Sequence, residues 1–179
     1  MKNMKGQAAM EYLMTYGWAI LAIVLVIAAL IFMNPFRAPE VCLFEQAGFT
    51  CNEPPPQLYV DQGGDLMMNV KMWNQVGQPI TVRNVLCTSA PGSEVPAAAA
   101  NHAVDANNYQ LQTGASFQAG GDNSNMGSIP CVDSLGNAIK SSSGQEFRGK
   151  LVVWYNYAND IDPSVKHQIK ANVISKVAG

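Results

Sequence analysis

A long apolar segment near the start of the chain is the feature that most constrains its fold. Within residues 12–33, only one threonine and two tyrosines carry hydroxyl groups, and no acidic or basic residue lies between Glu11 and Arg37. A helix over these 22 residues would be about 33 Å long, which matches a membrane hydrocarbon core of about 30 Å. We therefore expect a hydrophobic helix over residues 7–34, which ends before Pro35 because proline cannot continue it.

The residues before this segment argue against an ordinary secretory signal. Such a signal has a short apolar core with a small-residue cleavage site after it. Here the apolar segment is too long, and the small-residue site with a basic flank lies before it, at Gly6 and Gln7 next to Lys5. Cleavage after Gly6 would remove a leader of residues 1–6, keep the helix and make Glu11 the fifth residue of the mature chain.

This combination resembles the class III signal peptides of archaeal type IV pilins. The resemblance covers residues 1–33 and rests on the leader MKNMKG, the junction of Gly6 and Gln7, Glu11 at the fifth mature position, and the run EYLMTYGWAIL. It implies that a prepilin peptidase cuts after Gly6 on the cytoplasmic face, and that assembly machinery moves the helix from the membrane into the core of a filament of identical subunits. Archaellins fit less well, because they usually carry a glycine-rich start without the QAAMEY pattern.

Glu11 is the candidate assembly residue. An unpaired carboxylate near an apolar region is costly, so it needs a cation or a hydrated edge. The α-amino group that cleavage would create on Gln7 is the nearest candidate cation, in the same chain or in a neighbouring subunit. The alternative is that Glu11 lies at the level of the lipid headgroups at a helix start, where the helix dipole favours a negative charge.

The charges on either side of the apolar segment predict its orientation. Lys2 and Lys5 precede it, whereas Arg37 after it is offset by Glu40. The amino terminus is therefore expected to stay in the cytoplasm and the rest of the chain to lie outside. We expect a membrane-inserted precursor and, after assembly, an extracellular filament on the cell surface.

Four cysteines suit that oxidising compartment, where disulfides persist. No CxxC spacing occurs, which disfavours a zinc site. Of the three possible pairings we favour Cys42 with Cys51, because the short loop between them closes easily, and this leaves Cys87 with Cys131. The alternative is four buried free thiols.

The remainder of the chain predicts an α+β protein, in which the hydrophobic helix is followed by an all-β, sandwich-like head. Residues 35–57 contain Pro54, Pro55 and Pro56 and read as a proline-rich neck, with the head at residues 58–179.

Two strand pairs are expected in the head. Alternating residues at 66–73 followed by PITVRNVLC predict a hairpin, and GKLVVWYNY with VKHQIKANVISKV predicts an antiparallel pair with one solvated face. Between them, residues 89–144 predict loops with a short helical turn at 95–104, and residues 113–128 are expected to be loop.

No motif for catalysis, phosphate binding or dinucleotide binding occurs, so we expect no enzyme and no cofactor. His102 and His167 lack an accompanying nucleophile motif, and His167 reads as a structural residue of a strand. The turn at residues 159–162 could bind calcium, but an ordinary Asx turn is favoured over a metal site. The chain has 11 basic and 13 acidic residues and no basic patch, so no nucleic acid partner is expected.

The sequence thus predicts a structural subunit, a pilin, of an archaeal type IV-like adhesion pilus. The alternative is a membrane-anchored surface β domain that acts as a binding module without polymerising. An extracellular enzyme ranks third.

Overall fold

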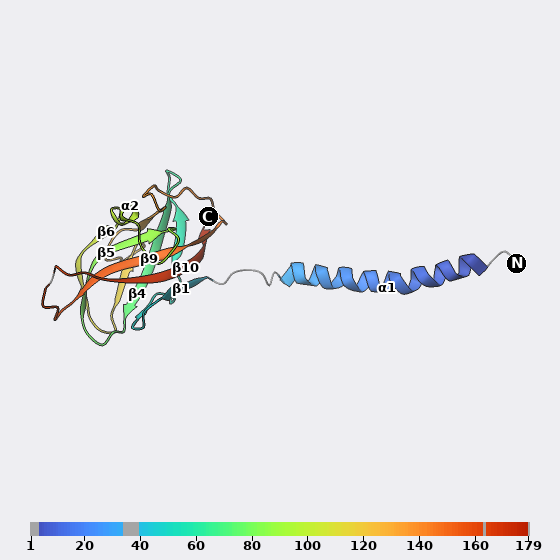
Figure 1. Cartoon of the computed structure of the whole chain (residues 1–179), viewed down its shortest axis with the longest axis horizontal. Helices are drawn as coiled ribbons and strands as arrows, with labels where there is room; N and C mark the ends of the chain where they lie inside the picture. Colours follow the sequence, from blue (N-terminus) through green and yellow to red (C-terminus); the bar gives the residue numbers. More distant parts are fainter. Residues whose placement is uncertain (1–3, 34–39, 163, 179) are drawn as a thin grey trace. The chain divides into compact units, whose positions relative to one another are not determined.

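The computed structural model describes residues 4–33, 40–162 and 164–178, which belong to two compact units, Met1–Ala38 and Pro39–Gly179 (Figure 1). The first unit contains the helix α1 (Met4–Met33). The second is rich in β structure. A hydrophobic amino-terminal helix followed by a β-rich domain, as expected from the sequence, is therefore confirmed.

The second unit contains ten strands and one short helix within the described residues. They are β1 (Val41–Phe44), β2 (Phe49–Thr50), β3 (Gln57–Val60), β4 (Leu66–Asn74), β5 (Ile80–Thr88), α2 (Ala97–Ala100), β6 (Val104–Leu111), β7 (Ser116–Ala119), β8 (Ile129–Val132), β9 (Glu146–Tyr157) and β10 (His167–Ala178). β7 lies in the segment that was expected to be loop.

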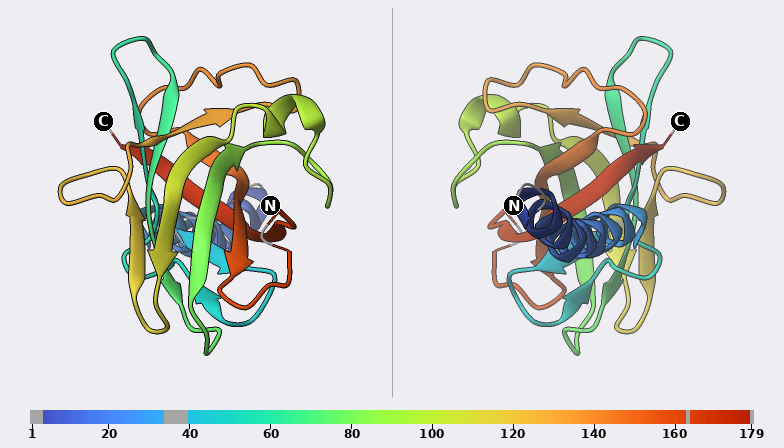
Figure 2. Two further views of the ribbon diagram at one scale, coloured as in Figure 1. Left: turned by 90° about the vertical axis from the view of Figure 1, so that its left-hand side faces the viewer. Right: turned by 90° about the vertical axis from the view of Figure 1, so that its right-hand side faces the viewer.

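Six of these strands close into a barrel, so the prediction of a sandwich-like head is wrong. The order around the barrel is β10, β3, β4, β8, β5 and β9, which pairs again with β10. The contacts of β10 with β3 and of β5 with β8 are parallel, and the other four are antiparallel. Figure 2 shows the strands curving around a shared interior.

The sequence predicted a sandwich rather than a barrel because residues 66–87 were expected to form a hairpin. β4 and β5 follow one another in the chain, but β8 lies between them and pairs with both. β8 has four residues and follows a segment rich in glycine and asparagine. It therefore gives almost no periodic signal in the sequence, and without it β4 and β5 look like direct partners.

The antiparallel pair predicted at the carboxyl end is confirmed as β9 and β10, which run side by side with Leu151 opposite Ala171. Alternate residues of β10 fill the interior of the barrel, including Ile169, Ala171 and Val173. β4 alternates in the same way, with every second residue buried. This alternation is the direct consequence of the two-residue period of a strand.

The β domain begins earlier in the chain than expected. β1 pairs with β10 and β2 pairs with β4, although both strands lie within residues 35–57, which were assigned to the neck. Of that proposed neck, residues 35–39 lie outside the described residues, as does residue 34 of the expected helix.

Two disulfides join the pairs of cysteines that the sequence analysis favoured. Cys42 and Cys51 link β1 to the segment after β2, with their Cα atoms 5.5 Å apart. Cys87 and Cys131 are opposite one another in the parallel pair β5 and β8, with their Cα atoms 4.5 Å apart. All four are buried, so the second disulfide crosslinks the wall of the barrel itself.

A second, smaller apolar cluster lies on the outside of the barrel. There Ala99 of α2 packs with Leu86, Val132 and Val152. Figure 1 shows α2 close to β5 and β6. The short helical turn predicted at residues 95–104 is thus present, and it covers outward-facing apolar residues of the barrel wall.

Candidate functional site: the apolar helix and the loop between β9 and β10

The helix α1 presents apolar side chains to its surroundings on every side. All described side chains between residues 10 and 32 are exposed. The five consecutive residues Ile23 to Ile27 each expose between 51% and 61% of their surface, and five residues exceed one full helical turn of about 3.6 residues. The helix therefore has no polar face that would suit water.

The apolar area on this helix is too large to remain in water. Eleven large apolar residues are exposed between Trp18 and Phe32, and burying each contributes about 1.5–3 kcal/mol. The sum, about 17–33 kcal/mol, exceeds the net stability of about 5–15 kcal/mol of an ordinary domain. Met10–Phe32 has the length and composition of a membrane span. Together with two disulfides, this indicates a secreted or membrane-anchored protein.

Glu11 lies at the beginning of this apolar stretch and is exposed. Its backbone carbonyl accepts a hydrogen bond from Thr15 Oγ1 at 2.9 Å. No ion pair to its carboxylate occurs among the side chains that the structure describes, which do not include that of Lys5. Gly6 and Gln7 lie within α1, and the side chain of Gln7 is outside the described set.

The distance of Glu11 from the amino-terminal end of α1 decides whether the helix dipole can stabilise its carboxylate. Because α1 begins at Met4, Glu11 is two turns into the helix of the uncut chain. The field of the helix terminus falls off within about one turn, so in this form the dipole does little for the carboxylate. Removal of residues 1–6 would bring Glu11 close to the new helix start.

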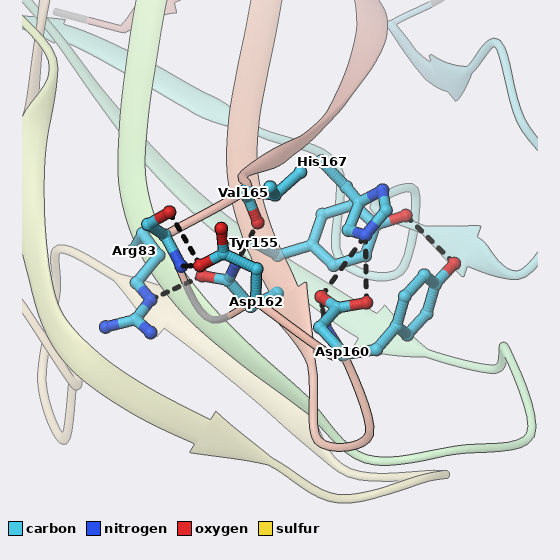
Figure 3. Close-up of polar contacts among 9 residues, drawn as sticks. Arg83, Tyr155, Asp160, Asp162, Val165 and His167 are labelled. Atoms are coloured by element: carbon cyan, nitrogen blue, oxygen red, sulfur yellow. Dashed lines mark hydrogen bonds and ion pairs between the residues drawn. The ribbon is translucent and has the colours of Figure 1, made fainter.

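A polar cluster holds the loop between β9 and β10 (Figure 3). Asp160 accepts a hydrogen bond from the backbone N–H of Tyr157 at 2.7 Å and lies 3.2 Å from Nε2 of His167. The hydroxyls of Tyr155 and Tyr157 are 3.1 Å apart, and the His167 ring packs against Tyr157 with centroids 4.9 Å apart. Burial and the bond to Tyr157 raise the pKa of the Tyr155 phenol.

The other side of the same loop is fixed by amide and guanidinium groups. Arg83 Nε donates to Asn156 Oδ1 at 2.6 Å, and Asn156 Nδ2 donates to the carbonyl of Val165 (Figure 3). Asp162 accepts hydrogen bonds from the hydroxyl and the backbone N–H of Ser164, which hold the pKa of its carboxyl below the usual range. The loop is therefore anchored on both sides to β5 and β9.

The hydrogen bonds of this cluster hold the loop between β9 and β10 in place. His167 and Asp160 form the kind of pair that can pass a proton, but in the described part of the chain no hydroxyl or thiol nucleophile hydrogen-bonds to His167. One oxygen of each aspartate accepts a hydrogen bond from a backbone N–H, and the bond from Ser164 to Asp162 is that of an Asx turn. No group of three metal-ligating side chains occurs in the described residues.

No model of a known protein family matches the chain, and no curated protein or solved structure gives a significant match. The class that the structure defines is therefore a protein with a hydrophobic amino-terminal helix and a disulfide-bonded β-barrel domain.

The hydrogen bond between Arg83 and Asn156 was not predicted from the sequence. It depends on a β-bulge at Arg83, and no periodic pattern in the sequence indicates a bulge.

Proposed function

We propose that this chain is a pilin, a structural subunit of an extracellular archaeal type IV-like adhesion pilus. The observation that carries the proposal is α1, which is apolar on every side and has one carboxylate, Glu11, at the start of its apolar stretch. The lipid of a membrane would surround such a helix before assembly, and identical helices packed around it would bury it afterwards.

Helix packing in a filament core needs close approach, and small residues permit it. Gly17 has open space around it, and Ala19, Ala22, Ala28 and Ala29 add further small positions along the helix. The large residues between them supply the apolar area. Transfer from lipid to a helical bundle exchanges one apolar environment for another, so packing and polar pairing decide the outcome rather than the hydrophobic effect.

The resemblance to class III signal peptides supplies the remaining steps of the proposal. A prepilin peptidase would cut between Gly6 and Gln7 on the cytoplasmic side, and the pilus assembly machinery would then take up the shortened chain. The new amine of Gln7 would pair with Glu11 of the same or a neighbouring subunit. This pairing compensates a charge that is otherwise costly in an apolar core.

The alternative is a membrane-anchored surface domain that acts as a binding module without polymerising. It is favoured by the β domain itself, whose closed barrel and two disulfides need no neighbouring subunit for completion. The alternative gives no role to the junction at Gly6 and Gln7 or to the position of Glu11.

Replacement of Glu11 distinguishes the two functions. We expect Glu11→Gln to insert in the membrane and be cleaved after Gly6, yet to enter filaments poorly, because the charge pair that guides each incoming subunit is lost. Sheared surface filaments are quantified by immunoblot against the membrane fraction. Glu94→Gln, at an exposed carboxylate of the β domain, is the matched control and should assemble as the parent chain does. Equal assembly of the two variants contradicts the proposed role of Glu11.

A further inference from the structure

A row of three side chains crosses the outer face of the barrel. In the pairing of the strands, Trp154 of β9 is opposite Asn84 of β5 on one side and opposite Gln168 of β10 on the other. The neighbours of Trp154 along β9, Val153 and Tyr155, belong to the interior core. Because successive residues of a strand point to opposite faces, an indole flanked by two amides faces outward.

A hollow of about 380 Å³ lies beside this row. It is lined by Asn84, Trp154 and Lys166 and by Ala100, Asn101 and Ala103 at the end of α2. Its volume is within the range of about 300–1,000 Å³ that is usual for small-ligand sites. Lys166 Nζ donates to Asn84 Oδ1 at 3.0 Å, so the two polar side chains are held together at the rim.

The indole in this hollow is supported from behind and accessible in front. Trp154 is partly buried and packs against the small apolar cluster that contains Leu86 and Val152. Among the described residues, its Nε1 donates no hydrogen bond to a protein acceptor. A tryptophan that keeps a polar donor free and one apolar surface partly open is suited to contact a ligand that is itself partly apolar and partly polar.

We propose that this hollow binds a pyranose ring of a glycan. The C–H face of a pyranose is a flat apolar surface that packs on an aromatic ring, while its hydroxyls project sideways. The amides of Asn84 and Asn101, which line the hollow, can each donate and accept hydrogen bonds, and Lys166 has further N–H donors. This site does not rest on the proposed function, because a filament subunit and an anchored domain would both display it.

Nuclear magnetic resonance of the full chain tests the proposal. The chain is held in dodecylphosphocholine micelles, whose headgroup contains no sugar, and titrated with the methyl glycosides of glucose, galactose, mannose and N-acetylglucosamine. Adenine, which contains no sugar, is the planar aromatic control. The three tryptophans give three indole N–H signals, and we expect that of Trp154 alone to shift and saturate with at least one glycoside. The expected Kd is about 1 mM, from the ligand efficiency over the thirteen non-hydrogen atoms of a methyl hexoside.

Variants separate a specific site from general contact. Asn84→Ala and Lys166→Ala change exposed or partly exposed polar groups and should each weaken binding about fivefold to tenfold, while the indole signals stay dispersed. Trp73→Phe, at the other tryptophan of the β domain, should leave the Kd unchanged. The proposal is overturned if no glycoside shifts Trp154 at about 50 mM, if adenine binds more tightly than every glycoside, or if neither polar variant alters the Kd.

Discussion

The disulfide in the barrel wall should stabilise the β domain more than the disulfide near its beginning. β8 contacts each of its barrel neighbours, β4 and β5, through two residue pairs. One of those pairs is Cys87 with Cys131, so the disulfide secures a strand with little hydrogen bonding of its own. Cys42 and Cys51 instead close a local loop beside β1 and β2.

The size of the difference follows from the lengths of the closed loops. The sequence separations are 44 for Cys87–Cys131 and 9 for Cys42–Cys51. In the chain-entropy treatment these loops correspond to about 4.0 and about 2.6 kcal/mol, a difference of about 1.4 kcal/mol. Each of the four cysteines exposes 2% or less of its surface, so the effect of removing buried sulfur is similar in both cases and cancels in the comparison.

The assay compares two double variants of the full chain in micelles. We expect Cys87→Ala with Cys131→Ala to lower the free energy of unfolding by about 1.4 kcal/mol more than Cys42→Ala with Cys51→Ala. Urea unfolding followed by tryptophan fluorescence gives both values, and similar slopes against urea show that the same surface unfolds. An equal or larger loss for the Cys42 and Cys51 variant would refute the reasoning from barrel closure and loop length.

Three further outcomes are expected. The free energy of unfolding should fall as the pH rises above about 10, because the phenol of Tyr155 ionises there in the unfolded chain, whereas burial raises its pKa in the folded chain. Urea unfolding at a series of pH values should show a smaller fall in this free energy for Tyr155→Phe. Asn74→Leu should lower the free energy of unfolding by about 2–4 kcal/mol in urea unfolding, since the buried amide donates to the carbonyl of Leu111 and to one other carbonyl; a loss below about 1 kcal/mol contradicts this. Mass spectrometry of the cellular protein should find a chain that begins at Gln7, and an intact amino terminus argues against the leader.

The elements that the sequence predicted well carry strong local signals. The apolar helix, the antiparallel pair β9 and β10, and the short turn around Ala99 each follow from residue type or periodicity within one segment. The pairing of Cys42 with Cys51 followed from the closure of a short loop, which is also a local argument, and the pairing of Cys87 with Cys131 followed because these two cysteines remained.

The barrel was missed because its closure depends on short strands that are distant in sequence. β3 pairs with β10 through Leu58 with Val177 and Tyr59 with Ala178, two parallel contacts across more than a hundred residues of chain. No periodic pattern encodes such a contact. The hollow beside Trp154 was missed for the same reason, since Asn84, Trp154 and Lys166 come from three separate segments that only the closed barrel brings together.

Electron microscopy of material sheared from the surface of the native cells tests the central proposal most directly. The account predicts thin filaments whose helical reconstruction shows a core of packed α1 helices, with density that begins at Gln7 and with β domains on the outside. Recovery of this chain as membrane-held monomers, in cells that possess the peptidase and assembly machinery, would contradict the pilin proposal and favour the anchored binding module.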